Sequence, residues 1–153
     1  MHFLKKLVLK PTTKCFHNCL YCKDRQIFYQ NCINDENQAV NNNLKGMQLS
    51  VLLQVGREAY ELGMRECLIS GGDPLIYPHL IKLISGIKKI STDIFVFMNS
   101  VGHGLTIQKA TEILNAGLGA WNFSVDTINE KNYDYIRGSK GALKQTLKAF
   151  DIR

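Results

Sequence analysis

Residues 66–98 read ECLISGGDPLIYPHLIKLISGIKKISTDIFVFM and contain one complete strand–helix–strand unit. The apolar runs at 66–70 and 94–98 have the length of strands, and leucine and isoleucine recur at helical spacing over 79–90 between them. A strand, a crossover helix and a second strand in this order predict a right-handed parallel βαβ unit.

The same alternation extends in both directions along the chain. Further strands are predicted at 3–12 and 120–125, and further helices at 50–62, 107–115 and 141–150. Ser50 is the expected N-cap of the first helix, and the strand at 120–125 is apolar on both faces, as in the centre of a sheet. The predicted fold class is α/β: a parallel (βα) repeat forming a partial TIM-type barrel of about four βα units.

Length and composition favour one globular domain over residues 1–153, with a flexible asparagine-rich loop at 31–45. Hydrophobic residues make up 45% and charged residues 21%, which excludes a largely disordered chain. No run approaches the ~18 apolar residues of a membrane span. Lys5 and Lys6 interrupt the first apolar run and no cleavage site follows, so we expect no signal peptide and a cytoplasmic protein.

The formal net charge is +6, and the positive excess is concentrated near the N-terminus. Residues 1–30 hold six basic side chains and one acidic one, a net charge of +5. Such a segment suits nucleic acid, an acidic protein, or an anionic cluster or cofactor. No basic helix or aromatic stripe accompanies it, so nucleic acid is the least expected of these partners.

Three of the five cysteines stand close together, in a C-x3-C-x2-C spacing formed by Cys15, Cys19 and Cys22. Three thiolates can bind three irons of a 4Fe–4S cluster and leave the fourth iron without a protein ligand. The alternative is a zinc site completed by His17 or Cys32. Structural zinc normally uses two cysteine pairs, and the remaining cysteines do not form a second pair.

This cysteine motif, placed directly after the first predicted strand, resembles that of the radical S-adenosylmethionine (radical SAM) enzymes. In that family the aromatic residue before the third cysteine, here Tyr21, lies near the adenine. The turn Gly71-Gly72-Asp73-Pro74 is similar to the family's GGEP-type motif, which contacts the amino group of S-adenosylmethionine. Asp73 stands where glutamate is commoner, and the backbone role of the glycines is unaffected.

Polar residues follow the later strands at the same predicted edge of the sheet. By the resemblance, Asn99, Ser100, Ser124 and Asp126 would contact the ribose and the methionine carboxylate. Arg137, followed by Gly138, matches an Arg-Gly pair of the molybdenum-cofactor-type and peptide-modifying branch, and its guanidinium could hold a carboxylate bidentately. The competing interpretation is a set of strand-end caps and a solvated arginine.

The resemblance implies an enzyme that receives an electron from a flavodoxin or ferredoxin and cleaves S-adenosylmethionine reductively at the 4Fe–4S cluster. The resulting 5′-deoxyadenosyl radical would abstract hydrogen from an unknown substrate, a peptide being one candidate. Two alternatives stay open: a small glycyl-radical-activating enzyme, and a non-catalytic iron–sulfur or zinc-binding module. Because the chain ends before the family's barrel is complete, we expect it to dimerise through the edge of the strand at 120–125, to need a second polypeptide, or to fold poorly with little cofactor cleavage.

Overall fold

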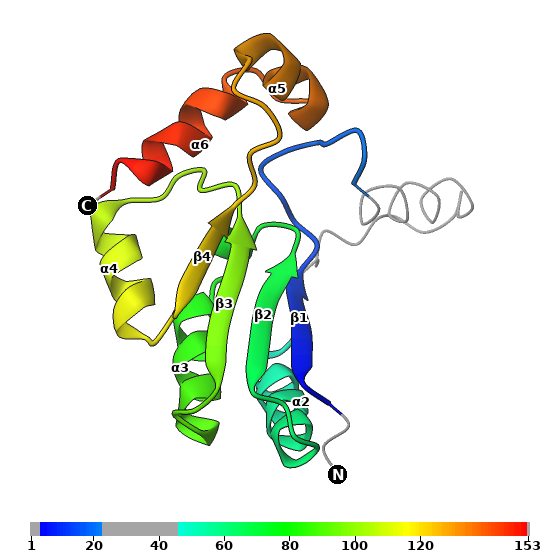
Figure 1. Cartoon of the computed structure of the whole chain (residues 1–153), viewed down its shortest axis with the longest axis vertical. Helices are drawn as coiled ribbons and strands as arrows, with labels where there is room; N and C mark the ends of the chain where they lie inside the picture. The colour runs from blue at the N-terminus through cyan, green and yellow to red at the C-terminus, as the bar shows by residue number, and fades with distance from the viewer. Residues whose placement is uncertain (1–3, 23–45, 153) are drawn as a thin grey trace.

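Four parallel strands form one sheet in the order β1-β2-β3-β4 (Figure 1). The computed structural model describes residues 4–22 and 46–152, so the predicted loop at 31–45 and Cys32 lie outside the described residues. The strands are β1 (Lys6–Thr12), β2 (Glu66–Gly71), β3 (Phe95–Ser100) and β4 (Ala120–Phe123). Each strand pairs in parallel with its neighbour, so their carboxyl ends meet at one edge. The predicted α/β fold class is confirmed.

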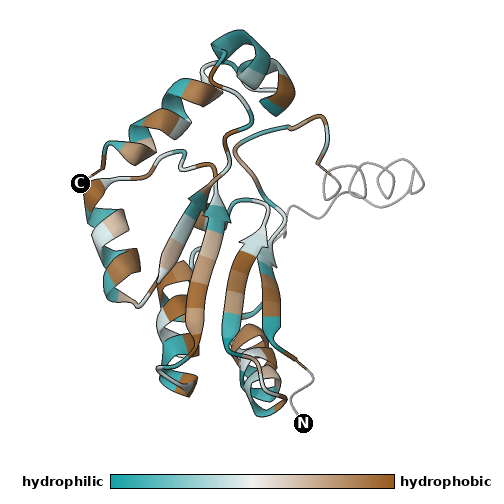
Figure 2. Ribbon diagram, viewed as in Figure 1, coloured by the Kyte–Doolittle hydropathy of each residue, from teal (hydrophilic) through white to brown (hydrophobic). Residues whose placement is uncertain are grey.

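Helices cover one face of this sheet and build the hydrophobic core against it (Figure 2). They include α2 (Leu49–Glu61), α3 (Leu80–Ile90) and α4 (Ile107–Asn115). Leu52 of α2, Leu83 of α3 and Met98 of β3 are almost completely buried in this layer. The βα alternation read from the sequence therefore produces a sheet with its crossover helices on one side.

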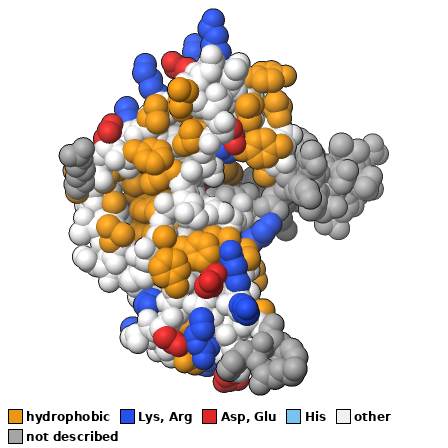
Figure 3. All heavy atoms as spheres, in the orientation of Figure 1, with side chains coloured by type: hydrophobic (Ala, Val, Ile, Leu, Met, Phe, Trp, Pro, Cys, Tyr) orange, Lys and Arg blue, Asp and Glu red, His pale blue; other side chains and the backbone are white. Residues whose placement is uncertain are grey.

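The other face of the sheet is open in the described part of the chain. In β3, Phe95 is 48% exposed whereas its neighbour Val96 is 1% exposed, and in β1 Val8 is likewise 48% exposed. Hydrophobic side chains are visible on the surface in Figure 3. The expectation that strand 120–125 is apolar on both faces is wrong: β4 ends at Phe123, and Asn122 is exposed on it.

Two element boundaries also differ from the prediction. Strand β1 begins at Lys6, later than predicted, and helix α2 begins at Leu49 with Gln48 as its N-cap. Ser50 is therefore the second residue of the helix instead of its cap. Gln48 has extended backbone angles and its side chain makes no capping hydrogen bond, so residue type gave no signal at this helix start.

The sequence interpretation missed helix α5 (Glu130–Arg137), which precedes α6 (Ala142–Phe150). The side chain of Asn129 caps α5 by accepting from the Asn132 amide, and Gly138 ends it in a left-handed conformation. The helix is short and mostly polar, so it has no clear hydrophobic periodicity. Both helices lie beyond the carboxyl ends of the strands (Figure 1).

A single turn of 3-10 helix, η1 (Pro74–Ile76), follows β2, and Asp73 is its N-cap. Among the described residues, no helix combines the length and the apolar composition needed to cross a membrane.

Candidate functional site

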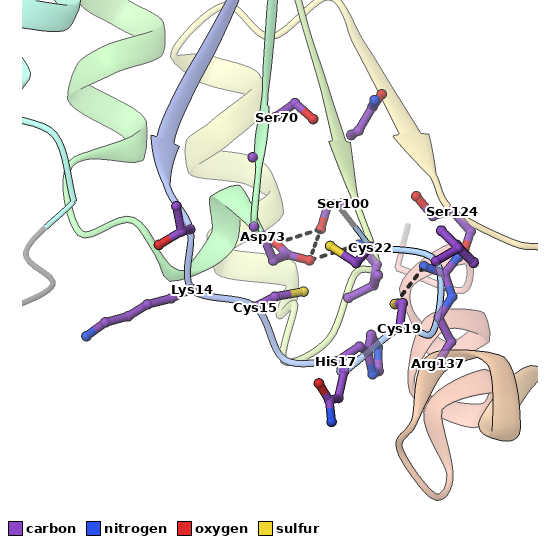
Figure 4. A pocket seen from close by; sticks show the side chains of 17 residues that line it. Lys14, Cys15, His17, Cys19, Cys22, Ser70, Asp73, Ser100, Ser124 and Arg137 are labelled. Atoms are coloured by element: carbon purple, nitrogen blue, oxygen red, sulfur yellow. Dashed lines mark hydrogen bonds between the residues drawn. The ribbon is translucent and has the colours of Figure 1, made fainter. Parts of the chain in front are cut away.

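A pocket of about 410 Å³ lies at the carboxyl ends of the strands. This volume falls within the range of small-molecule sites. Eleven of the twelve site residues proposed from the sequence line it: Cys15, Cys19, Tyr21, Cys22, Gly71, Gly72, Asp73, Asn99, Ser100, Ser124 and Arg137 (Figure 4). The twelfth, Asp126, is held beside the pocket by Tyr21 and Arg137. Residues far apart in the sequence thus share one cavity.

The first side of the cysteine loop (residues 15–22) is fixed by the turn after β2. The Gly72 amide donates to the Thr12 carbonyl at 2.8 Å, and the Asp73 amide donates to the Lys14 carbonyl at 2.7 Å. A Cβ on Gly72 would lie 2.0 Å from the Lys14 oxygen. Glycine at this position therefore allows the turn and the start of the cysteine loop to pack backbone against backbone.

The second side of the cysteine loop is fixed by the last turn of α5. The Asn18 amide donates to the Arg137 carbonyl and the Leu20 amide donates to the Ile136 carbonyl, each at 2.9 Å. A Cβ on Gly138 would lie 2.5 Å from the Asn18 oxygen, so this end of α5 also approaches the loop closely. The unpaired carbonyls of a helix end are thereby used to hold the loop.

Asp73 is 1% exposed and its carboxylate is occupied by protein donors. It accepts from the Leu75 amide at 2.9 Å, the Ser100 hydroxyl at 3.0 Å and the Val101 amide at 2.9 Å. Burial raises the pKa of this carboxyl, and the hydrogen bonds oppose that rise. The hydroxyl of Ser100 also accepts from the Gly102 amide. The side chains of Asp73 and Ser100 therefore join β2 to β3.

Arg137 is 4% exposed and contacts three protein groups through its two terminal nitrogens. Nη2 donates to the Ser124 carbonyl at 2.8 Å and lies 2.9 Å from the Asp126 carboxylate, while Nη1 donates to the Cys19 sulfur at 3.5 Å. Burial opposes the charge, but the Cys19 hydrogen bond and nearby groups raise the pKa of Arg137 above its usual value. The solvated arginine considered from the sequence is thus excluded.

Tyr21 and Asn99 complete the polar lining. The Tyr21 hydroxyl donates to the Asp126 carboxylate at 3.2 Å, and partial burial raises the pKa of Tyr21 to about 12. The Asn99 side-chain oxygen accepts from Asn122 across the β3–β4 pair at 3.1 Å. Both residues line the pocket.

His17 is a pocket residue that the sequence interpretation set aside. It is 8% exposed, and neither of its ring nitrogens has a hydrogen-bond partner. Burial, assisted by the charge of Arg137, lowers the pKa of His17 to about 4. Its ring meets the His103 ring edge to face, and His103 stacks on Phe16 at 4.6 Å. The sequence feature that pointed to His17 as a pocket residue was its position between Cys15 and Cys19.

The donors in the pocket fit a sulfur-ligated cluster with a polar molecule beside it. Three free thiols open onto the cavity from one loop. Arg137 Nε and both nitrogens of His17 are buried there without partners, which leaves an N–H donor on Arg137 and one donor and one acceptor on the imidazole for a bound group. Over residues 4–22 and 46–152, no three His, Cys, Asp or Glu side chains are gathered to share a single metal ion. Cys32, which the zinc alternative also names, lies outside these residues.

Comparison with known families finds one match over most of the chain. The family described as the Radical SAM superfamily matches residues 9–152. Among curated proteins, GTP 3′,8-cyclase of Clostridium perfringens (strain SM101) is 30% identical over 132 residues. That alignment covers 85% of this chain and 37% of the relative, so the chain spans well under half of the relative's length.

Comparison with solved structures finds the same fold at low sequence identity. Streptococcus suis SuiB bound to S-adenosylmethionine superposes with a TM-score of 0.70 at 17% identity, over 97% of this chain and 29% of that one. SuiB bound to the precursor peptide SuiA superposes with a TM-score of 0.70 at 19% identity, over 97% of this chain and 30% of that one. These similarities concern the fold.

Proposed function

The chain belongs to the radical SAM superfamily, and from this membership we propose that it binds a 4Fe–4S cluster through Cys15, Cys19 and Cys22. We further propose that S-adenosylmethionine binds in the same pocket. When bound, these groups would supply reductive cleavage to a 5′-deoxyadenosyl radical that abstracts hydrogen from a substrate. The single observation that carries the proposal is the convergence of the three thiols and the Gly71-Gly72 turn on one cavity.

The proposed roles of the lining residues follow from their contacts. Gly71 and Gly72 bring bare backbone to the pocket, where carbonyl oxygens can accept from an ammonium group. Asp73 and Ser100 hold that backbone in place, because their side chains are already bonded to each other and to neighbouring amides. We propose that these two residues act on the cofactor through backbone position.

Further polar residues also line the cavity. As the family resemblance implies, Tyr21 is proposed to lie near the adenine, and Asn99 and Ser124 are proposed to contact the ribose and the methionine carboxylate. The carboxylate of Asp126 currently pairs with Arg137. Arg137 Nε, which is buried and unpaired, offers a further donor. Burial in this pocket would also keep water from the reacting groups.

We propose a flavodoxin or ferredoxin as the electron donor. Two relatives suggest substrates to compare: GTP, named in the cyclase, and a peptide, as in SuiB bound to SuiA. An assay with each substrate distinguishes them, because product should depend on one and not on the other.

The test is anaerobic reconstitution, followed by iron and sulfide analysis and by measurement of 5′-deoxyadenosine after reduction. We expect about four irons and four sulfides per chain and cofactor cleavage. Stoichiometric zinc without iron would identify a zinc module, and a cluster without cleavage would identify a non-catalytic iron–sulfur module. Cleavage accompanied by radical transfer to a partner protein would identify the small activating enzyme.

Cysteine variants provide a matched control for this test. Cys19→Ala should abolish the sulfur-to-iron absorption of the reconstituted protein. Cys67→Ala should leave it intact, because Cys67 is completely buried in β2 and does not line the pocket. Burial raises the pKa of the Cys67 thiol to about 12 and keeps it protonated. Equal loss of absorption in both variants would contradict the ligand assignment.

A further inference from the structure

Arg137 is a buried cation whose guanidinium points at one of the three cysteines of the loop (Figure 4). Its Nη1 donates to the Cys19 sulfur at 3.5 Å, although 118 residues separate the two in the sequence. Cys19 is the buried member of the three cysteines lining the pocket. A charged donor beside a buried sulfur is a strong local electrostatic feature, because little water screens it.

The contact is set from outside the cysteine loop. Nη2 of Arg137 is held by the Ser124 carbonyl and the Asp126 carboxylate, which leaves Nη1 turned toward the sulfur. The carbonyl of Arg137 itself accepts from the Asn18 amide, next to Cys19. One residue therefore binds both the backbone beside this cysteine and its thiol.

We propose that Arg137 is a positioning residue that raises the reduction potential of the cluster by donating a hydrogen bond and positive charge at Cys19. This inference rests on the proposed function, since it requires a cluster on the three cysteines. A reduced cluster carries one more negative charge than an oxidised one. A cation and an N–H donor at a ligand sulfur stabilise the reduced form more, which raises the potential.

A negative charge, on Asp126, also lies at this contact. Its removal should change the potential in the direction opposite to removal of Arg137. Asp126 pairs with Nη2 and offsets part of the arginine charge, and its side chain is 33% exposed. Removing the Asp126 charge should therefore increase the effect of Arg137 on the cluster.

The experiment is a redox titration of the reconstituted full chain, followed by electron paramagnetic resonance, with iron and sulfide measured on the same samples. Arg137→Met should shift the midpoint potential to more negative values, and Arg137→Lys should shift it less. Asp126→Asn should shift it to more positive values. Lys131→Met, which removes an exposed charge from the same helix, should leave the potential unchanged because solvent screens that site.

The outcomes separate this inference from the proposed function. Absence of a cluster in the wild-type chain overturns the proposed function. A wild-type cluster combined with an unchanged potential in Arg137→Met overturns only the inference, as do shifts of the same sign in Arg137→Met and Asp126→Asn. If Arg137→Met fails to bind a cluster, Arg137→Lys and Asp126→Asn decide the question by the direction of their shifts.

Discussion

The turn after β2 and the last turn of α5 both hold the cysteine loop, and each contains a buried charged residue. At the first, Asp73 is surrounded by donors from Leu75, Ser100 and Val101. At the second, Arg137 contacts Ser124, Asp126 and Cys19 but keeps its Nε without a partner. The carboxylate is satisfied by the fold, whereas the guanidinium retains a donor for something else.

The two buried charges therefore differ in role: Asp73 supports the structure, whereas Arg137 keeps a donor for a ligand. A buried charge surrounded by protein donors stabilises its own region, and removing it leaves those donors unpaired. A buried charge with an unused donor is held at some cost in desolvation, and such groups occur where a ligand completes them. We therefore expect removal of the Asp73 carboxylate to act mainly on stability, and removal of the Arg137 guanidinium to act mainly on the site.

The largest effect is expected from Gly72→Ala. The added methyl would lie 2.0 Å from the backbone oxygen of Lys14, and backbone cannot move aside as a flexible side chain can. The variant should lose at least about 3 kcal/mol of unfolding free energy, and the loop should no longer bind a cluster. Chemical denaturation and iron content measure this.

Gly104→Ala is the matched control, since a Cβ at Gly104 meets nothing within 4 Å. Gly104 has a φ of +71°, so its substitution introduces backbone strain without a collision. It should cost about 1 kcal/mol and retain the cluster. Equal effects of the two alanine substitutions would show that close packing at the turn after β2 is unimportant.

A smaller loss is expected from Asp73→Ala, which leaves two amides and one hydroxyl without an acceptor. The free energy of unfolding should fall by about 2 to 3 kcal/mol, as measured by denaturation of the cluster-free chain. Asp73→Asn keeps one acceptor oxygen and should lose less. A neutral result for Asp73→Ala would remove the contrast between the two buried charges.

A still smaller effect is expected from Gly138→Ala, at the end of α5 that holds the second side of the cysteine loop. The residue has a φ of +58° and its Cβ would approach the Asn18 oxygen at 2.5 Å, but it is exposed, so α5 and the loop can separate slightly. We expect a loss of about 1 to 2 kcal/mol, with the cluster retained. Complete loss of the cluster would show that the end of α5 is as essential as the turn after β2.

The smallest effect is expected from Tyr21→Phe, which removes only the hydroxyl contact to Asp126. Tyr21 is 53% exposed and the hydrogen bond is 3.2 Å long, so water can replace it. The unfolding free energy should change by about 0.5 kcal/mol. A change several times this size would mean that the Tyr21 hydroxyl also helps to hold the cysteine loop in place beside α5.

Much of the fold and the site was predictable from local pattern. The strands at 66–70 and 94–98 and the helix at 107–115 follow directly from short apolar runs and helical spacing, and α4 has the predicted bounds. Helix α5 was not found because its buried face consists mainly of Tyr133 and Arg137, too few residues to produce a period. Its Asn129 cap and its Gly138 end were the available signals.

The strand–helix alternation from β1 to β4, and the C-x3-C-x2-C spacing that predicts cluster ligation, were determined by the sequence, because both depend on residues close together along the chain. Parallel strands also bring their carboxyl ends to one edge, so the gathering of the GG turn, Asn99 and Ser124 near the cysteines could be expected. The contact of Arg137 with Cys19 was decided only by the tertiary structure. It depends on how α5 packs across the cysteine loop, and no local pattern specifies the distance between two residues 118 positions apart.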